Sequence, residues 1–209
     1  LLASGGIHIG GTDYDRALNL AAAMPLFGFG SLTTTGASLP SPLFFQLATW
    51  HTIPLAYSRA AWADFQQLYR MSAERAKLDR LARLIDQRGG HWLALQVEAA
   101  KIALSDQHTA SVSLEAFFPD LDVVATREAF AEVTGDLVRR TADKVAELLC
   151  QANLAAASID TLFFTGGGSG VPQLRAAIKA VLPDAQEREG DRFGSIGSGL
   201  ALEARRRYG

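Results

Sequence analysis

Three polar residues at helical spacing, Glu98, Lys101 and Ser105, are the first candidates for chemistry in this sequence. Separations of three and four positions place them on one face of a helix over two turns. They offer an acceptor, a cation and a hydroxyl, which suit the hydroxyls and ring nitrogens of a ligand. The alternative is a solvated helix edge with an intrahelical Glu98–Lys101 ion pair, worth about 0.2–0.5 kcal/mol. The spacing alone favours that alternative.

A glycine-rich turn is the second candidate. Residues 161–164 are β-branched or apolar, as in a strand, and four of the five residues 166–170 are glycine. Glycines accept positive φ and let a ligand approach the main chain, and Pro172 suits the first turn of a helix. Such a unit can receive a nucleotide or phosphate. A turn without a ligand is equally compatible, because neither G-x-G-x-x-G nor G-x-x-x-x-G-K-[ST] is matched.

No complete catalytic constellation is visible. The sequence has no G-x-S-x-G or H-E-x-x-H motif, and its four histidines are scattered. Asp13 and Asp15 fall in the first turn of an expected helix, where the helix dipole favours carboxylates. We interpret them as residues of a helix start rather than an acid/base pair, and we expect neither catalytic nor metal-binding residues.

Composition and charge restrict the class of protein. With 209 residues, 48% of them apolar, and a net charge of −2, the chain resembles an ordinary globular protein, and nothing favours binding to nucleic acid. No apolar run approaches the roughly 18 residues of a membrane span. The single cysteine, Cys150, excludes an internal disulfide and fits a reducing compartment, so we expect a cytoplasmic protein. Its apolar neighbours predict a structural thiol.

Hydrophobic periodicity and turn residues predict the elements that position these candidates. We expect a hairpin over 1–9, helices over 62–85, 91–105 and 126–153, and a hairpin over 110–125, with Thr126 as a helix N-cap. A strand over 161–164 precedes a helix from Pro172, and a final helix ends the chain. Residues 25–56 favour loops broken by short buried helices, with an exposed aromatic patch for a partner as the alternative.

Five segments, in order, resemble motifs of one family, the 70-kDa heat-shock chaperones (DnaK type). Residues 8–15 resemble its H-L-G-G-x-D-F-D motif, residues 98–105 its E-x-x-K-x-x-L-S helix, and residues 126–130 its T-R-x-x-F helix start. Residues 165–172 are similar to V-G-G-S-x-R-I-P, and residues 191–197 to P-D-E-A-V-A-x-G-A-A. The apolar region 25–90 departs from ordinary members and looks more like the divergent YegD-type chaperones.

The resemblance implies an α/β fold of the ribonuclease-H-like, actin-like ATPase type, and only its second lobe. Residues 1–9 and 126–209 would form the inner α/β subdomain. Residues 10–125 would form the outer α+β subdomain with a helical hairpin. The complete protein would be a slow ATPase that binds ATP or ADP, with Mg²⁺, in the cleft between its two lobes.

The same resemblance implies which residues line the adenosine side of that cleft. They are Gly10, Gly11, Glu98, Lys101, Ser105, Gly166, Gly167 and Asp191. Glu98 and Lys101 would contact the ribose, and Ser105 the adenine. The glycines would let the backbone approach the nucleoside and phosphates, and Asp191 would lie at the edge of the pocket.

Two departures from the family affect these expectations. Gly170 stands where the family has an arginine stacked on the adenine, a contact worth about 0.5–2 kcal/mol. The family's phosphate loops, catalytic lysine and proton-accepting acid would all precede Leu1, and a start at leucine suggests a longer protein. We therefore expect the 209-residue chain not to hydrolyse ATP and to bind adenosine nucleotides weakly at most.

The expected partners are the missing N-terminal lobe, client polypeptides and co-chaperones, with no nucleic acid and no membrane. Two alternatives share the superfold: an actin-like assembly or scaffold protein, and a small-molecule kinase.

Overall fold

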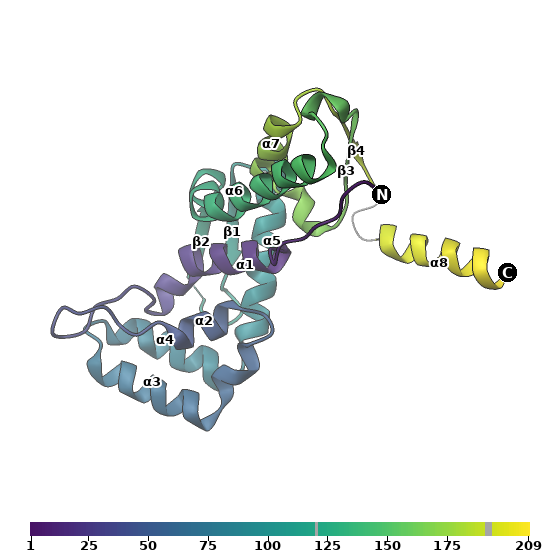
Figure 1. Ribbon diagram of the computed structural model, residues 1–209. Helices are drawn as coiled ribbons and strands as arrows, with labels where there is room; N and C mark the ends of the chain where they lie inside the picture. Colours follow the sequence, from purple (N-terminus) through teal and green to yellow (C-terminus); the bar gives the residue numbers. More distant parts are fainter. Residues whose placement is uncertain (120, 191–193) are drawn as a thin grey trace. The chain divides into compact units, whose positions relative to one another are not determined.

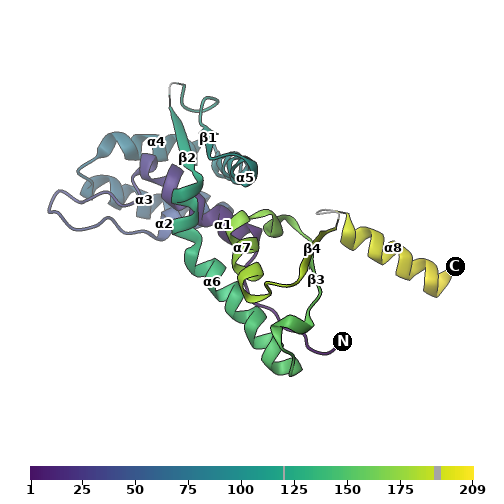
Figure 2. The ribbon, with the colours of Figure 1, turned by 90° about the horizontal axis from the view of Figure 1, so that it is seen from above.

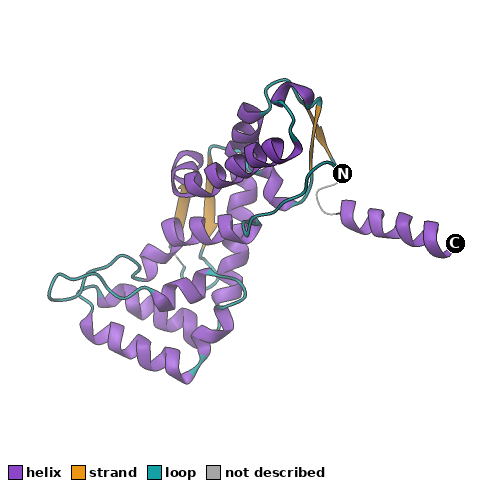
Figure 3. Ribbon diagram, in the orientation of Figure 1, coloured by secondary structure: helices purple, strands orange, loops and turns teal. Residues whose placement is uncertain are grey.

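The computed structural model describes residues 1–119, 121–190 and 194–209. Its contacts divide the chain into two units. The helical unit comprises residues 12–134, and the glycine-turn unit comprises residues 1–11 and 135–209. Helices dominate the described chain, and the strands are short (Figure 3). The subdomain boundaries expected after residues 9 and 125 stay a prediction.

The helical unit is built mainly from helices, followed by one hairpin (Figure 1). Its longer elements are α1 (Gly11–Leu18), α2 (Pro42–Ala48), α3 (Arg59–Met71), α4 (Arg75–Asp86), α5 (Gly90–Asp106), β1 (Thr109–Ser113), β2 (Asp122–Thr126) and the start of α6 (Arg127–Ala152). Short helical turns, η1 (Asn19–Ala23), η2 (Met24–Phe27) and η3 (Ile53–Tyr57), connect them. The largest fully buried side chains of the unit include Tyr14, Phe27, Phe44 and Phe130.

Residues 25–56 carry short buried helices, as expected. Leu43, Phe44 and Leu47 of α2 are buried because one face of this short helix is apolar. Trp50 follows α2 and remains 44% exposed. The segment is therefore part of the core, with two aromatic rings, Phe45 (39% exposed) and Trp50, left partly at the surface.

The expected single helix over 62–85 is wrong, because the chain leaves helical geometry at residues 72–74 between α3 and α4. Ser72 has extended backbone angles and forms an isolated bridge with Thr33. Its hydroxyl accepts a hydrogen bond from the Glu74 backbone N–H (3.0 Å). Serine competes for backbone hydrogen bonds in this way, and it interrupts helices where a tertiary partner is available.

The hairpin and the helix start after α5 are confirmed. Strands β1 and β2 pair antiparallel with Val112 opposite Val123, and β1 packs against α5 (Figure 2). The Thr126 hydroxyl accepts a hydrogen bond from the Ala129 backbone N–H (3.1 Å), which satisfies one free donor of the first turn of α6.

The glycine-turn unit contains the remainder of α6 and the elements β3 (Thr161–Phe164), η5 (Gly167–Gly170), α7 (Pro172–Val181), β4 (Gln186–Glu189) and α8 (Ser195–Tyr208). Strand β3 covers the expected residues and Pro172 opens α7, as predicted. Strand β4, which the sequence did not predict, pairs parallel to β3. No helix in the described ranges is long and apolar enough to cross a membrane.

Two expectations for this unit are wrong. Residues 1–10 form no strand in the described structure, so the hairpin over 1–9 is absent. Two three-residue arms provide too few cross-strand pairs to hold a hairpin by themselves. Cys150 is exposed, so the expected structural thiol is not buried. The residue lies off the face of α6 that carries the apolar side chains.

Candidate functional site

Lys101 is buried and reaches α1 rather than the edge of its own helix. Its Nζ lies 2.7 Å from Oδ1 of Asp15, and the two side chains are only 8% and 18% exposed. Glu98 forms no ion pair within the described residues, so the intrahelical Glu98–Lys101 pair, the alternative to a ligand-binding face, is not present. Asp15, interpreted from the sequence as a helix-start carboxylate, is instead the partner of a candidate site residue.

The Asp15–Lys101 pair is electrostatically unusual because so much of it is removed from water. Burial raises the pKa of the Asp15 carboxyl above its usual value, and the nearby charge of Glu98 adds to this. The hydrogen bond and positive charge of Lys101 act in the opposite direction. The charge of Lys101 therefore serves first to keep a buried carboxylate ionised.

The far end of the same α5 face is closed by Arg127. Its Nε donates to the Leu104 carbonyl (2.9 Å), and its Nη2 donates to the Ser105 carbonyl (3.3 Å). These carbonyls lie in the last turn of α5, where backbone C=O groups have no N–H partner within the helix. Arg127 belongs to the T-R-x-x-F segment, and its role here is to fix the end of the helix that carries Ser105.

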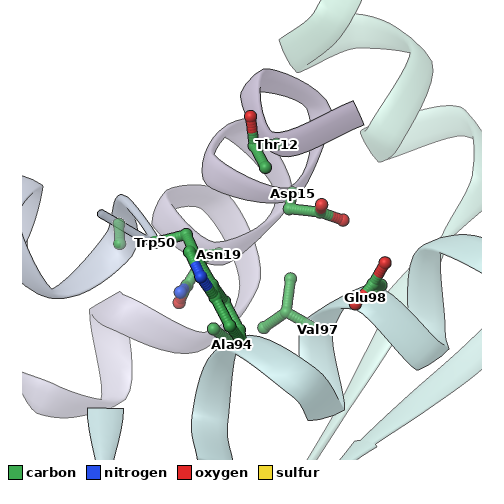
Figure 4. Close-up of a pocket in the computed structure, with 8 residues that line it drawn as sticks. Thr12, Asp15, Asn19, Trp50, Ala94, Val97 and Glu98 are labelled. Atoms are coloured by element: carbon green, nitrogen blue, oxygen red, sulfur yellow. The ribbon is translucent and has the colours of Figure 1, made fainter. Parts of the chain in front are cut away.

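A pocket of about 230 Å³ opens between α1, α5 and the segment after α2 (Figure 4). Its lining residues are Thr12, Asp15, Asn19, Ala48, Trp50, Ala94, Val97 and Glu98. Asn19 is 1% exposed, and its Oδ1 has no hydrogen-bond partner within the described structure. The sequence did not predict this pocket, although Asn19 and Asp15 are four positions apart, next to the buried Tyr14 and Leu18.

The glycine turn in the glycine-turn unit brings two predicted segments together. Gly166 has a φ of +82°, which favours glycine. A methyl group on Gly168 would lie 3.5 Å from the backbone nitrogen of Gly11. The turn at residues 166–170 therefore lies against Gly11, so two of the glycine segments assigned by the resemblance are neighbours in space.

Arg175 of α7 holds this turn, a role that no sequence signal predicted. Its Nε donates to the Ser169 carbonyl (2.6 Å), and its guanidinium lies over the Phe164 ring at 4.8 Å. The same guanidinium forms ion pairs with Glu189 and, at 3.8 Å, with Glu187 of β4. One side chain thus connects the turn, β3 and β4.

Comparison with known proteins identifies the family. The sequence model of the Hsp70 protein family matches residues 67–204, which is more than half of the chain. The chain belongs to the Hsp70 family. It is also similar to the heat shock 70 kDa protein BIP3 of Oryza sativa subsp. japonica, with 31% identity over 115 residues. That match covers 54% of this chain and 17% of the rice protein, so the chain spans a small part of that relative's length.

The Hsp70 match confirms the family that the motifs resembled, whereas the YegD-type subgroup stays a prediction. The described residues form a mixed α/β structure that is mostly helical with two small sheets, which is compatible with part of an Hsp70 ATPase domain. The matched range contains Glu98, Lys101 and Ser105, and it also contains the glycine turn. Asp191 lies in the match but outside the residues that the structure describes.

Proposed function

We propose that this chain forms the adenosine side of the nucleotide cleft in the ATPase domain of an Hsp70-type chaperone. The observation that carries the proposal is the face of α5. Glu98 and Ser105 are half-buried there, and Lys101 between them is held by Asp15. These residues lie in the range that matches the family.

Each side chain on this face has a chemical role in the proposal. The Glu98 carboxylate accepts hydrogen bonds from ribose hydroxyls, and the Ser105 hydroxyl bonds to a ring nitrogen of adenine. An ammonium has three donors, so Lys101 can keep its bond to Asp15 and still donate to the ribose. Arg127 keeps the last turn of α5 closed, which positions Ser105.

The glycine segments provide backbone rather than side chains. In the proposal Gly10, Gly11, Gly166 and Gly167 let the main chain approach the nucleoside and phosphates, and Asp191 lies at the edge of the pocket. The glycine turn belongs to a different unit from α5, and the family resemblance alone assigns both to one site. Gly170 supplies no stacking arginine, so binding by this chain is weak.

Phosphoryl transfer needs clamps on the phosphates and Mg²⁺, which the resemblance assigns to another lobe. We therefore propose that ATP or ADP with Mg²⁺ is the ligand of the complete cleft, and that the 209-residue chain alone does not hydrolyse ATP. The other lobe, client polypeptides and co-chaperones are the proposed partners, in the cytoplasm. ATP turnover by the purified chain above a buffer blank would contradict this assignment.

The binding test is a titration of the chain with ADP, followed by NMR chemical shifts or calorimetry. Glu98→Gln removes a charged acceptor, worth about 1.5 kcal/mol or more, so ADP should bind at least about tenfold more weakly. Glu132→Gln is the matched control, because Glu132 is exposed on α6. Equal ADP affinity in the two variants, or no saturable binding by the unmodified chain, would count against the proposal.

A further inference from the structure

The pocket between α1, α5 and Trp50 shares Glu98 with the proposed nucleotide contacts, but its other lining residues, among them Asn19 and Trp50, take no part in those contacts. Of the three α5 candidates, only Glu98 is among the described residues that line it. Lys101 and Ser105 lie further along the helix. The pocket is therefore a second feature of the helical unit, and it needs its own explanation.

Its polar groups are mainly acceptors. Asp15 is neutralised by Lys101, whereas the Glu98 carboxylate forms no ion pair within the described residues, so one negative charge remains at the pocket. The Asn19 Oδ1 is buried and has no donor within the described structure. A buried acceptor without a partner is unfavourable, and a ligand that donates hydrogen bonds would remove that deficit.

Trp50 adds an aromatic wall. Its ring remains 44% exposed although it lines the pocket, and His91 packs against it edge-to-face with centroids 4.9 Å apart at 77°. His91 therefore contacts the Trp50 ring on one side, and the exposed part of the ring can contact a ligand. An indole face next to a carboxylate attracts organic cations, and a planar guanidinium both stacks on the ring and donates several hydrogen bonds.

We infer that this pocket binds a guanidinium group, stacked on Trp50 and donating to Glu98 and Asn19. A volume of about 230 Å³ accommodates one such group with a short alkyl chain. The group could belong to a small free cation or to an arginine side chain of a polypeptide. Both sources present the same chemistry to the pocket.

The test uses ethylguanidinium chloride as the probe and ethylurea as a neutral molecule of similar shape, at matched ionic strength. Ligand-observed NMR on the 209-residue chain should show saturable binding of ethylguanidinium and none of ethylurea. Trp50→Ala should weaken the binding about five- to tenfold, and Glu98→Gln by a similar factor. Trp62→Ala is the control, because Trp62 is also partly exposed but stacks on Phe65 outside the pocket.

Equal binding of the two probes, or unchanged affinity in Trp50→Ala, would overturn the inference. Comparing ethylguanidinium with N-acetyl-arginine methylamide separates the sources: equal affinity supports a small cation, and tighter peptide binding supports an arginine side chain. The ADP affinity of Trp50→Ala should equal that of the unmodified chain. A loss of ADP binding in that variant would show that the pocket belongs to the nucleotide site, and would overturn the separate site while leaving the proposed function standing.

Discussion

Removing the charge of Lys101 should destabilise the chain by leaving the Asp15 carboxylate buried without its partner. Deleting one member of a buried ion pair costs about 3–5 kcal/mol. The Asp15 side chain is 18% exposed, so water can solvate part of its charge. We therefore expect Lys101→Met to lower the free energy of unfolding by about 2–3 kcal/mol. At this chain length each kcal/mol lowers Tm by roughly 2–4 °C, so Tm should fall by about 4–12 °C.

The loss of stability in Lys101→Met should depend on pH, and the pKa of the Asp15 carboxyl determines the direction of that dependence. Burial already raises the pKa of this carboxyl above 3.8, and Lys101 is the main opposing influence. Without Lys101 the pKa rises further, so the folded chain binds a proton more tightly than the unfolded chain does. Stability gained from such a group is present at low pH and is lost as pH rises through the folded-state pKa. The deficit of Lys101→Met should therefore be smaller at about pH 5 than at about pH 7.5.

Urea unfolding of a double-mutant cycle measures this coupling. The cycle compares Lys101→Met, Asp15→Asn and the double variant. Either substitution should lower the free energy of unfolding much less when the other is already present. Lys144→Met is the control, because Lys144 pairs with Glu147 three residues along α6, and such partly exposed pairs are worth at most about 1 kcal/mol. The reasoning is refuted if Lys101→Met behaves like this control, or if its deficit grows on acidification.

Three further substitutions test local features. Arg175→Ala removes the donor to the Ser169 carbonyl, so backbone amides of residues 166–170 should exchange with deuterium faster, whereas unchanged exchange would show that the turn holds itself. Gly166→Ala forces a side chain into a φ of +82°, which should cost about 1–2 kcal/mol in urea unfolding; a neutral result would contradict the backbone geometry. Thr126→Ala removes the cap on the Ala129 N–H and should cost about 1 kcal/mol, which Thr126→Ser should largely restore.

Local patterns predicted much of the fold. Strand 161–164 is apolar and bounded by glycine, and Pro172 fixes the start of the helix that follows. Helix α5 has a continuous apolar stripe, and the hairpin at 109–126 alternates between buried and exposed positions in β1. In each case the residues that determine the element lie inside it or next to it.

The features that the sequence did not predict depend on distant partners. Strand β4 consists of Gln-Glu-Arg-Glu and carries no apolar signal, so it forms only because β3 lies beside it. The break at Ser72 needs Thr33 as a bridge partner. The Asp15–Lys101 pair joins two helices that are far apart in the chain. Periodicity within one segment contains no information about any of these.

The ion pair also changes how the α5 face should be tested. A Lys101→Ala variant that binds ADP poorly has two explanations, a lost ribose contact and a disturbed α1–α5 packing around Asp15. Glu98 has no ion pair within the described residues, and Arg127 contacts Ser105 through the Ser105 backbone carbonyl rather than its hydroxyl. Glu98→Gln and Ser105→Ala therefore remove the proposed ligand contacts without leaving a buried charge unpaired. If both variants keep full stability and lose ADP affinity while Lys101→Met loses stability, the face has two functions: Lys101 holds α5 to α1, and its neighbours bind the nucleotide.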